Sequence, residues 1–301
     1  MSIRAWVARR ILRFYNSRQN YTLAGIAKQR QVHIWDRLLF SVRENELTRT
    51  SIAEVPVVKI HATIPTSRTI IYLHGGGFVF GLSPVYLRHM KRLAKLCRTN
   101  VIALDYSLAP EQPYPQALEE IQRVWQQLIA DGAIDPTSTV LVGDSAGGNL
   151  ALASSMRWRD AALPQPACLA LISPGLDATL RGESYTKKAA VDPVLTRSKL
   201  EFFSSTYAGS TPKDNPFISP VYADVSGLPP VVIHVGSEEM LLSDSQVVVQ
   251  KIRESGGDVT LLQGEGMWHC WHLLASYIPE ARQAMHAFAV SIDTYLSADR
   301  P

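Results

Sequence analysis

Short runs of apolar and β-branched residues alternate along the chain with longer segments whose apolar residues recur at helical spacing. The runs that predict strands are 69–74, 100–106, 139–144, 167–173, 230–235 and 258–264, and residues 54–64 predict antiparallel strands at one edge. The segments that predict helices are 83–97, 115–131, 147–158, 242–255 and 279–296. Strands that are apolar throughout and alternate with helices are typical of a mostly parallel sheet covered on both faces. The pattern therefore predicts an α/β fold.

Two regions interrupt this alternation. Residues 1 to about 45 predict two helices before any strand, and residues 177 to about 216 are too long for a plain crossover and contain a helical pattern. We expect both regions to pack together over the carboxyl edge of the sheet, where ligands bind in open α/β folds. The predicted division is 1–45 for the N-terminal part of a helical cap, 46–176 and 217–301 for the two parts of the α/β domain, and 177–216 for the cap insertion.

The composition is that of an ordinary globular protein. Of 301 residues, 46% are hydrophobic and 19% are charged, and the net charge is +3. Lys and Arg are scattered rather than gathered on one element, so we expect no nucleic-acid partner. Cys97, Cys168 and Cys270 are odd in number and lack metal-ligand spacing, which favours reduced thiols and a cytoplasmic location.

The first 18 residues form the densest basic segment of the chain. Ile3, Trp6, Val7, Ile11 and Phe14 recur there at helical spacing with arginines between them. We expect an amphipathic helix that packs on the rest of the protein, with a place on a membrane surface as the alternative. The segment lacks the unbroken apolar core of a signal peptide, and no run in the chain reaches the roughly 18 apolar residues of a membrane span. We therefore expect no stable membrane insertion.

A very short turn joins the strand run at 139–144 to the helical segment that follows it. Gly143, Ser145 and Gly147 form the pattern G-x-S-x-G in that turn. A serine hydroxyl must project clear of the backbone to attack a carbonyl carbon, and the sharp turn that projects it leaves no room for side chains two positions away. The context predicts a nucleophile elbow, with the amides of the following helix favouring negative charge nearby.

The segment YLHGGGFVFG, at residues 72–81, follows another predicted strand. Acyl transfer passes through a tetrahedral oxyanion that needs preorganised N–H donors, and glycine lets the backbone turn its amides inward. We predict that Gly76, Gly77 and Ala146 form this oxyanion hole. His74 is expected to brace the loop, and Asp144 to hold neighbouring groups by hydrogen bonds rather than to act as an acid.

The catalytic base is expected on the loop after the last strand, where GEGMWHCWH follows residue 263. His269 comes first after the glycines of this loop and is the predicted base, while His272 is expected to open the next helix. Cys270 and the two histidines have no fourth ligand at useful spacing, so we expect no metal site and no cofactor.

The triad also needs a carboxylate that holds the imidazole in the correct tautomer. The segment GSEEMLLSDS, after the strand run at 230–235, offers three acids. Glu239 is the predicted acid because it stands just before an apolar stretch that enters the core. Glu238 and Asp177 remain alternatives, and Asp244 is expected to be a surface or capping group.

With these residues in view, the chain resembles the hormone-sensitive-lipase-like family of microbial carboxylesterases, which have the α/β-hydrolase fold. The resemblance rests on HGGGF at 74–78, DYSLAPEQPYPQA at 105–117, GDSAGGNLA at 143–151, NPFISPVYAD at 215–224, GLPPVVIHVGSEEMLLSDS at 227–245 and GMWHCW at 266–271. It implies that Ser145 is the nucleophile, His269 the base and Glu239 the acid, with Gly76, Gly77 and Ala146 as oxyanion donors. The family more often has aspartate at the position of Glu239.

The motifs and the resemblance together predict a serine carboxylesterase. We expect hydrolysis of carboxylic esters through an acyl-enzyme on Ser145, and the resemblance favours short to medium acyl chains and a helical cap. An amidase or lactonase on the same scaffold, or a receptor that binds small molecules without catalysis, are the alternatives. The expected partner is a small-molecule ester, and the resemblance leaves a homodimer open.

Overall fold

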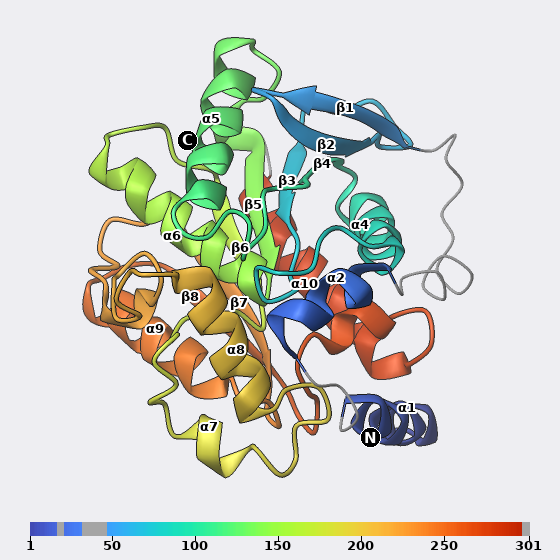
Figure 1. Ribbon diagram of the computed structural model, residues 1–301. Coiled ribbons are helices and arrows are strands. Elements are labelled where there is room, and N and C mark those ends of the chain that lie inside the picture. The colour runs from blue at the N-terminus through green and yellow to red at the C-terminus, as the bar shows by residue number, and fades with distance from the viewer. Residues whose placement is uncertain (17–20, 32–46, 297–301) are drawn as a thin grey trace.

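The computed structural model describes residues 1–16, 21–31 and 47–296, and eight strands of this described chain form one sheet (Figure 1). The strands are β1 (Thr48–Ile52), β2 (Val55–Ile60), β3 (Thr69–Leu73), β4 (Asn100–Leu104), β5 (Thr139–Asp144), β6 (Cys168–Ile172), β7 (Val231–Gly236) and β8 (Val259–Gly264). Their order in the sheet is β1-β2-β4-β3-β5-β6-β7-β8. The pairs β1–β2 and β2–β4 are antiparallel, and all other pairs are parallel. The predicted mostly parallel sheet with an antiparallel edge is confirmed.

Helices cover both faces of the sheet (Figure 1). They are α4 (Pro84–Cys97), α5 (Gln116–Ala130), α6 (Ala146–Asp160), α9 (Leu242–Glu254) and α10 (Pro279–Leu296), and the short 3-10 helices are η2 (Pro136–Ser138), η3 (Pro220–Tyr222) and η4 (Trp271–Leu274). Successive strand residues point to opposite faces, so Ile71 of β3 packs into the core under α5, α6 and α9, and Ile70 into the core under α4 and α10. Burial on both faces explains why the strands read as continuous apolar runs.

Four helices lie outside these two layers: α1 (Ile3–Asn16), α2 (Leu23–Gln31), α7 (Ser184–Lys187) and α8 (Arg197–Ala208). We call these helices and the loop from α7 to α8 the cap. Its two parts touch, because the Asn16 side chain donates to the carbonyl of Pro193 at 3.1 Å and the rings of Tyr21 and Phe203 lie 5.4 Å apart. The domain boundaries stay a prediction, and residues 17–20 and 32–45 of the predicted N-terminal part fall outside the described residues.

Helix α1 packs on the protein by a different face from the one we expected. Ala5 is fully buried, and Ala8 and Leu12 pack against the core under α4 and α10. The large apolar side chains that predicted the helix point outward, since Ile3 is 83% exposed and Phe14 is 59% exposed. The helix packs on the rest of the protein as expected, but it does so through Ala5, Ala8 and Leu12 instead of its largest apolar side chains, because the two alanines allow a close approach.

Candidate active site

Ser145 stands between β5 and α6 in a strained turn. Its φ of 53° lies in the left-handed region, which a residue with a side chain adopts only where the surroundings enforce it. A methyl group on Gly147 would lie 2.0 Å from the carbonyl oxygen of Leu73, and one on Gly143 would lie 2.2 Å from that of Gly147. The two glycines therefore allow β3, β5 and α6 to meet closely enough to form the elbow.

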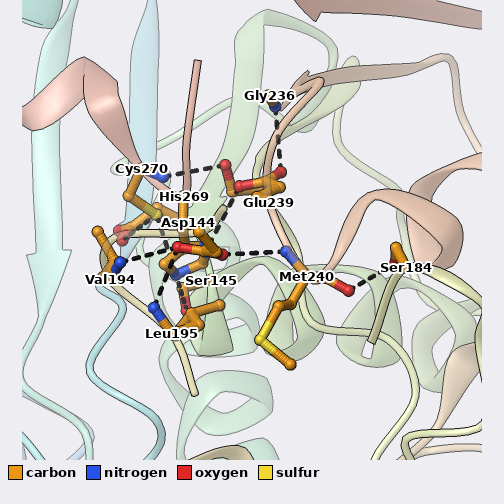
Figure 2. Close-up of polar contacts among 12 residues, drawn as sticks. Asp144, Ser145, Ser184, Val194, Leu195, Gly236, Glu239, Met240, His269 and Cys270 are labelled. Atoms are coloured by element: carbon orange, nitrogen blue, oxygen red, sulfur yellow. Dashed lines mark hydrogen bonds and ion pairs between the residues drawn. The ribbon is translucent and has the colours of Figure 1, made fainter. Parts of the chain in front are cut away.

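His269 reaches Ser145 from the loop between β8 and η4 (Figure 2). Its Nε2 atom lies 3.0 Å from the Ser145 Oγ atom, which is hydrogen-bond distance. On the other side of the ring, Nδ1 lies 3.3 Å from Oε2 of Glu239. Glu239 is fully buried in the loop after β7, where its other oxygen accepts a hydrogen bond from the Gly236 N–H at 3.1 Å. The three residues thus form a chain from hydroxyl to imidazole to carboxylate.

The alternative acids face elsewhere. Glu238 forms an ion pair with Arg9 of α1. Asp177 accepts hydrogen bonds from the backbone of Thr179 and Arg181 in its own loop. Asp244 is buried, which corrects the expected surface position, and it binds the backbone N–H of Asp177 at 3.0 Å. Among the acids of this segment, Glu239 is the one that meets the base histidine.

Burial sets the protonation of the histidine and the carboxyl group. Desolvation lowers the pKa of His269 to about 4, while the negative charge of Asp192 works in the opposite direction. The ring is therefore neutral at neutral pH and can accept a proton from Ser145. Desolvation raises the pKa of Glu239, and the hydrogen bond from Gly236 partly offsets this rise by stabilising the carboxylate.

The glycine-rich loop after β3 passes beside Ser145. Gly76 and Gly77 have φ values of 118° and 62°, and a methyl group on Gly77 would lie 2.3 Å from the ring of Phe203. Side chains are excluded at both positions, so the backbone itself lies next to the nucleophile. Ala146 begins α6 and lines the same cavity as Gly77 and Ser145. The role of Gly76, Gly77 and Ala146 as oxyanion donors stays a prediction.

Buried polar groups hold this loop in place. His74 stacks on Tyr106 with ring centroids 4.3 Å apart, and the Tyr106 hydroxyl donates to the His74 carbonyl at 2.6 Å. Oδ1 of Asp144 accepts the N–H of Gly75 at 2.9 Å and the hydroxyl of Tyr72 at 2.9 Å. His74 and Asp144 therefore fasten the glycine loop to β3 and β5, in the bracing roles expected of them.

A small cavity of about 60 Å³ opens beside Ser145 and Ala146. Its walls are mostly apolar, and the larger side chains that line it are Phe78, Leu180, Tyr185, Leu195, Phe203 and Tyr207. Two other aromatic residues, Phe202 and Trp271, are not among the lining residues. Phe202 packs next to Tyr21, and Trp271 is buried against His234 on the far side of the catalytic loop. The cavity has the character of a site for a small apolar group.

Sequence reasoning missed another buried carboxylate near the predicted triad, Asp192 of the cap. One of its oxygens accepts hydrogen bonds from the N–H groups of Val194 and Leu195. The other accepts a hydrogen bond from the N–H of Met240 at 3.0 Å. Ser184, also in the cap, donates to the Met240 carbonyl at 2.6 Å (Figure 2). An aspartate before a proline indicates only a turn, so the sequence carried no signal of this contact.

His272 lies away from the nucleophile. It is buried, and its Nε2 atom lies 3.1 Å from Nδ1 of His234. Cys270 is buried as well, with its sulfur 3.5 Å from Nε2 of His269. Across residues 1–16, 21–31 and 47–296, no group of three or more His, Cys, Asp or Glu side chains is arranged to hold a metal ion.

Comparison with known proteins agrees with the fold. A protein family described by its alpha/beta hydrolase fold matches residues 70–273. LipR of Mycobacterium tuberculosis, named as a candidate acetyl-hydrolase, is 40% identical over 240 residues, covering 79% of this chain and 77% of that protein. An esterase of Acinetobacter venetianus is 36% identical over 239 residues, covering 78% of each. An esterase structure from the bacterial hormone-sensitive lipase family superposes with a TM-score of 0.91 at 29% identity, covering 99% of both chains.

The fold and these matches define the class of the protein as an α/β hydrolase. Within that class, the chain belongs to the hormone-sensitive-lipase-like family of esterases. It is a carboxylic ester hydrolase, which decides against the alternative of a receptor without catalysis.

Proposed function

We propose that this protein hydrolyses short- to medium-chain carboxylic esters through an acyl-enzyme on Ser145. The observation that carries the proposal is the continuous chain from the Ser145 hydroxyl to Nε2 of His269 at 3.0 Å and from Nδ1 to Glu239 at 3.3 Å. Such a chain places a base beside a weak nucleophile and a carboxylate behind the base, which is the arrangement that acyl transfer through serine requires.

In the first half of the reaction, Ser145 Oγ attacks the ester carbonyl carbon as its proton moves to Nε2 of His269. The carbonyl oxygen becomes an oxyanion that accepts hydrogen bonds from the N–H groups of Gly76, Gly77 and Ala146. The intermediate then breaks its carbon–oxygen bond to the alcohol, which leaves with the proton from His269. In the second half, His269 takes a proton from water, the resulting hydroxide attacks the acyl-enzyme, and Ser145 leaves with that proton. Glu239 keeps the imidazolium oriented and stabilised in both halves.

The size of the cavity supports a short acyl group. The space beside Ser145 and Ala146 is about 60 Å³, and Phe203 and Tyr207 form part of its wall. A short acyl group such as acetyl needs little of this space, whereas a long chain would require the rings to move. Apolar walls bind a hydrocarbon chain by removing its surface from water, and they offer no compensation for a charged acyl group.

The test is hydrolysis of p-nitrophenyl esters from acetate to palmitate by the wild type and four variants at matched folded concentration. We expect Ser145→Ala and His269→Ala to lose at least about a thousandfold in kcat, and Glu239→Ala a smaller but large factor. Glu238→Ala is the matched control, because this neighbouring acid pairs with Arg9 instead. If Glu238→Ala lost more activity than Glu239→Ala, the assigned acid would be wrong. A preference for aryl amides over these esters would instead support the amidase alternative.

A further inference from the structure

The outer face of α1 carries several exposed apolar side chains. Ile3, Val7, Ile11 and Phe14 follow one another at helical spacing, and each is exposed, with Ile3 at 83% and Ile11 at 62%. The opposite face of the helix turns Ala5 toward the core. In Figure 1, α1 lies at the periphery of the molecule. Exposed apolar faces of this kind usually mark an interaction site.

The charge of the helix is entirely positive. The sequence IRAWVARRILRFYN contains four arginines and no acidic residue. Arg4 and Arg10 are exposed beside the apolar stripe, and the guanidinium of Arg10 lies 4.9 Å from the centre of the Trp6 ring. Arg9, which is half-buried, and Arg13, which is exposed, donate to the backbone carbonyl of Val191 at 2.8 and 3.2 Å. The helix therefore offers an apolar surface bordered by cations.

A groove lies between α1 and the cap loop. Its volume is about 320 Å³, and it is lined by Met1, Trp6, Arg9, Arg10, Arg13, Ala190 and Val191. Arg9 is already paired with Glu238, and Arg9 and Arg13 bind the Val191 carbonyl. Their remaining donors, together with those of Arg10, are suited to phosphate oxygens, because each planar guanidinium presents several donors in a fork. An apolar wall beside these donors suits an anionic group that carries a hydrocarbon chain. The chemistry of the groove is that of an anionic lipid headgroup site.

We propose that α1 docks this protein on an anionic lipid surface, with its apolar stripe in the outer acyl layer and its arginines at the headgroup phosphates. An interfacial helix needs this combination of a large apolar face and basic flanks. A second copy of the chain is a poorer occupant, because two α1 helices face to face would bring Arg4 and Arg10 near arginines of the same sign. The helix has no acid that would compensate this repulsion.

Docking through α1 is compatible with the described helices, none of which is both long and apolar enough to cross a membrane. The helix contacts the cap loop through Arg9 and Arg13, and that loop reaches the cavity at Leu195. Attachment of α1 would therefore bring the cap, and the cavity beneath it, to the lipid surface.

The test is sedimentation of the full-length protein with large vesicles of phosphatidylcholine alone or phosphatidylcholine mixed with phosphatidylglycerol. We expect binding to the anionic vesicles that weakens as salt is raised, and little binding to the neutral vesicles. The variants Ile3→Ser/Phe14→Ser and Arg4→Gln/Arg10→Gln should each weaken binding by at least about tenfold. Matched controls are Val290→Ser on α10, a residue that is 54% exposed, and Arg197→Gln on α8, where the arginine is paired with Glu201.

The outcomes separate this proposal from the esterase proposal. Hydrolysis of dissolved p-nitrophenyl acetate should be unchanged in Ile3→Ser/Phe14→Ser, because these side chains point away from the site. The docking proposal is overturned if the wild type stays in solution with anionic vesicles at low salt, or if the apolar variant binds them as well as the wild type does. It is also overturned if analytical ultracentrifugation shows that the apolar variant turns a dimer into a monomer, since the face would then join two copies.

Discussion

Met240 donates its backbone N–H to the carboxylate of Asp192 at 3.0 Å, and this bond ties the cap to the residue that follows the proposed catalytic acid. The Met240 carbonyl is bound from the cap as well, by the Ser184 hydroxyl at 2.6 Å. The residue before the acid, Glu238, pairs with Arg9 of α1. Both neighbours of Glu239 are therefore held by cap residues, although Glu239 itself follows a strand of the sheet.

The first prediction concerns Asp192→Asn, which removes a negative charge and weakens the bond to Met240. We expect kcat to fall by about 10- to 100-fold with little change in KM, because small displacements of catalytic groups cost this much. The acid limb of kcat/KM should also move to lower pH, since the charge of Asp192 raises the pKa of His269 and its loss lowers that pKa further. Kinetics on p-nitrophenyl acetate from about pH 3 to pH 8 measure both effects.

Asp135→Asn is the control for this prediction. Asp135 also accepts a backbone N–H, that of Thr137 at 2.9 Å, but it caps a short helix away from the site. We expect it to alter stability without moving the pH profile. An unchanged kcat and an unchanged acid limb in Asp192→Asn would show that the cap does not position the acid.

The sheet could be predicted from the sequence, and so could the meeting of Ser145, His269 and Glu239, whose catalytic roles stay a proposal. The contacts from the cap could not be predicted. The apolar runs at 69–74 and 139–144 could be recognised as strands because both faces of each strand are buried. The bounds of β3 and β5 agree closely with these runs. β1 was missed because four of its five residues are exposed and no alternation marks it. The G-x-S-x-G turn could be recognised because side chains at the two glycine positions would clash with the neighbouring backbone. Asp192 was not, because its role depends on a backbone N–H that is 48 residues away in the chain.

The orientation of α1 shows a second limit of the sequence. Periodicity at helical spacing predicted the helix correctly, but it does not say which stripe faces the protein. The small face with Ala5 packs inward, and the large face with Ile3 points outward. A hydrophobic pattern records which side chains share a face, and the partner of that face has to be found from the structure.

The second prediction tests the elbow with Gly147→Ala. The new methyl group would lie 2.0 Å from the Leu73 carbonyl oxygen, so the backbone of β3 or α6 has to move. We expect a loss of more than about 2 kcal/mol in the free energy of unfolding and nearly complete loss of activity. Urea denaturation and p-nitrophenyl acetate turnover measure the two effects.

Gly132→Ala is the control for this prediction. It separates the cost of a steric clash from the cost of placing a side chain at a positive φ. Gly132 also has a positive φ, 63°, but a methyl group there meets no atom within 4 Å. We expect it to cost about 1 kcal/mol in the free energy of unfolding and to leave kcat unchanged. Equal losses in the two variants would mean that close packing at the elbow is not what requires Gly147.

The third prediction concerns the buried histidine His234. Burial lowers its pKa to about 4, so the folded protein binds fewer protons than the unfolded chain between about pH 4 and pH 6.5. The stability that this residue contributes is therefore present above pH 6.5 and is lost as pH falls toward 4, by up to about 1.4 kcal/mol per pH unit. His234→Gln should lose less stability than the wild type between pH 7 and pH 5, as urea denaturation at both values will show.

Comparing the wild type with His234→Gln separates the effect of His234 on acid stability from that of groups that stabilise the folded state as pH falls. Asp144 has its pKa raised to about 6 by burial, so it favours the folded state as pH falls, and it does so equally in both proteins. His286→Gln is the matched control, because this histidine on α10 is exposed. If the wild type and His234→Gln lost the same stability between the two pH values, His234 would not be a source of the acid sensitivity.

The fourth prediction rests on the proposed acyl site and concerns Phe203. Its ring forms part of the cavity wall beside Ser145 and packs closely on Gly77, where a methyl group would lie 2.3 Å from the ring. Phe203→Ala removes the ring and lengthens the cavity, so we expect the preferred p-nitrophenyl ester to shift toward longer acyl chains while activity on acetate falls. Phe202→Ala is the control, because this neighbouring ring does not line the cavity and its loss should leave the preferred chain length unchanged. A shift in Phe202→Ala but not in Phe203→Ala would mean that the acyl chain lies along the outer side of α8.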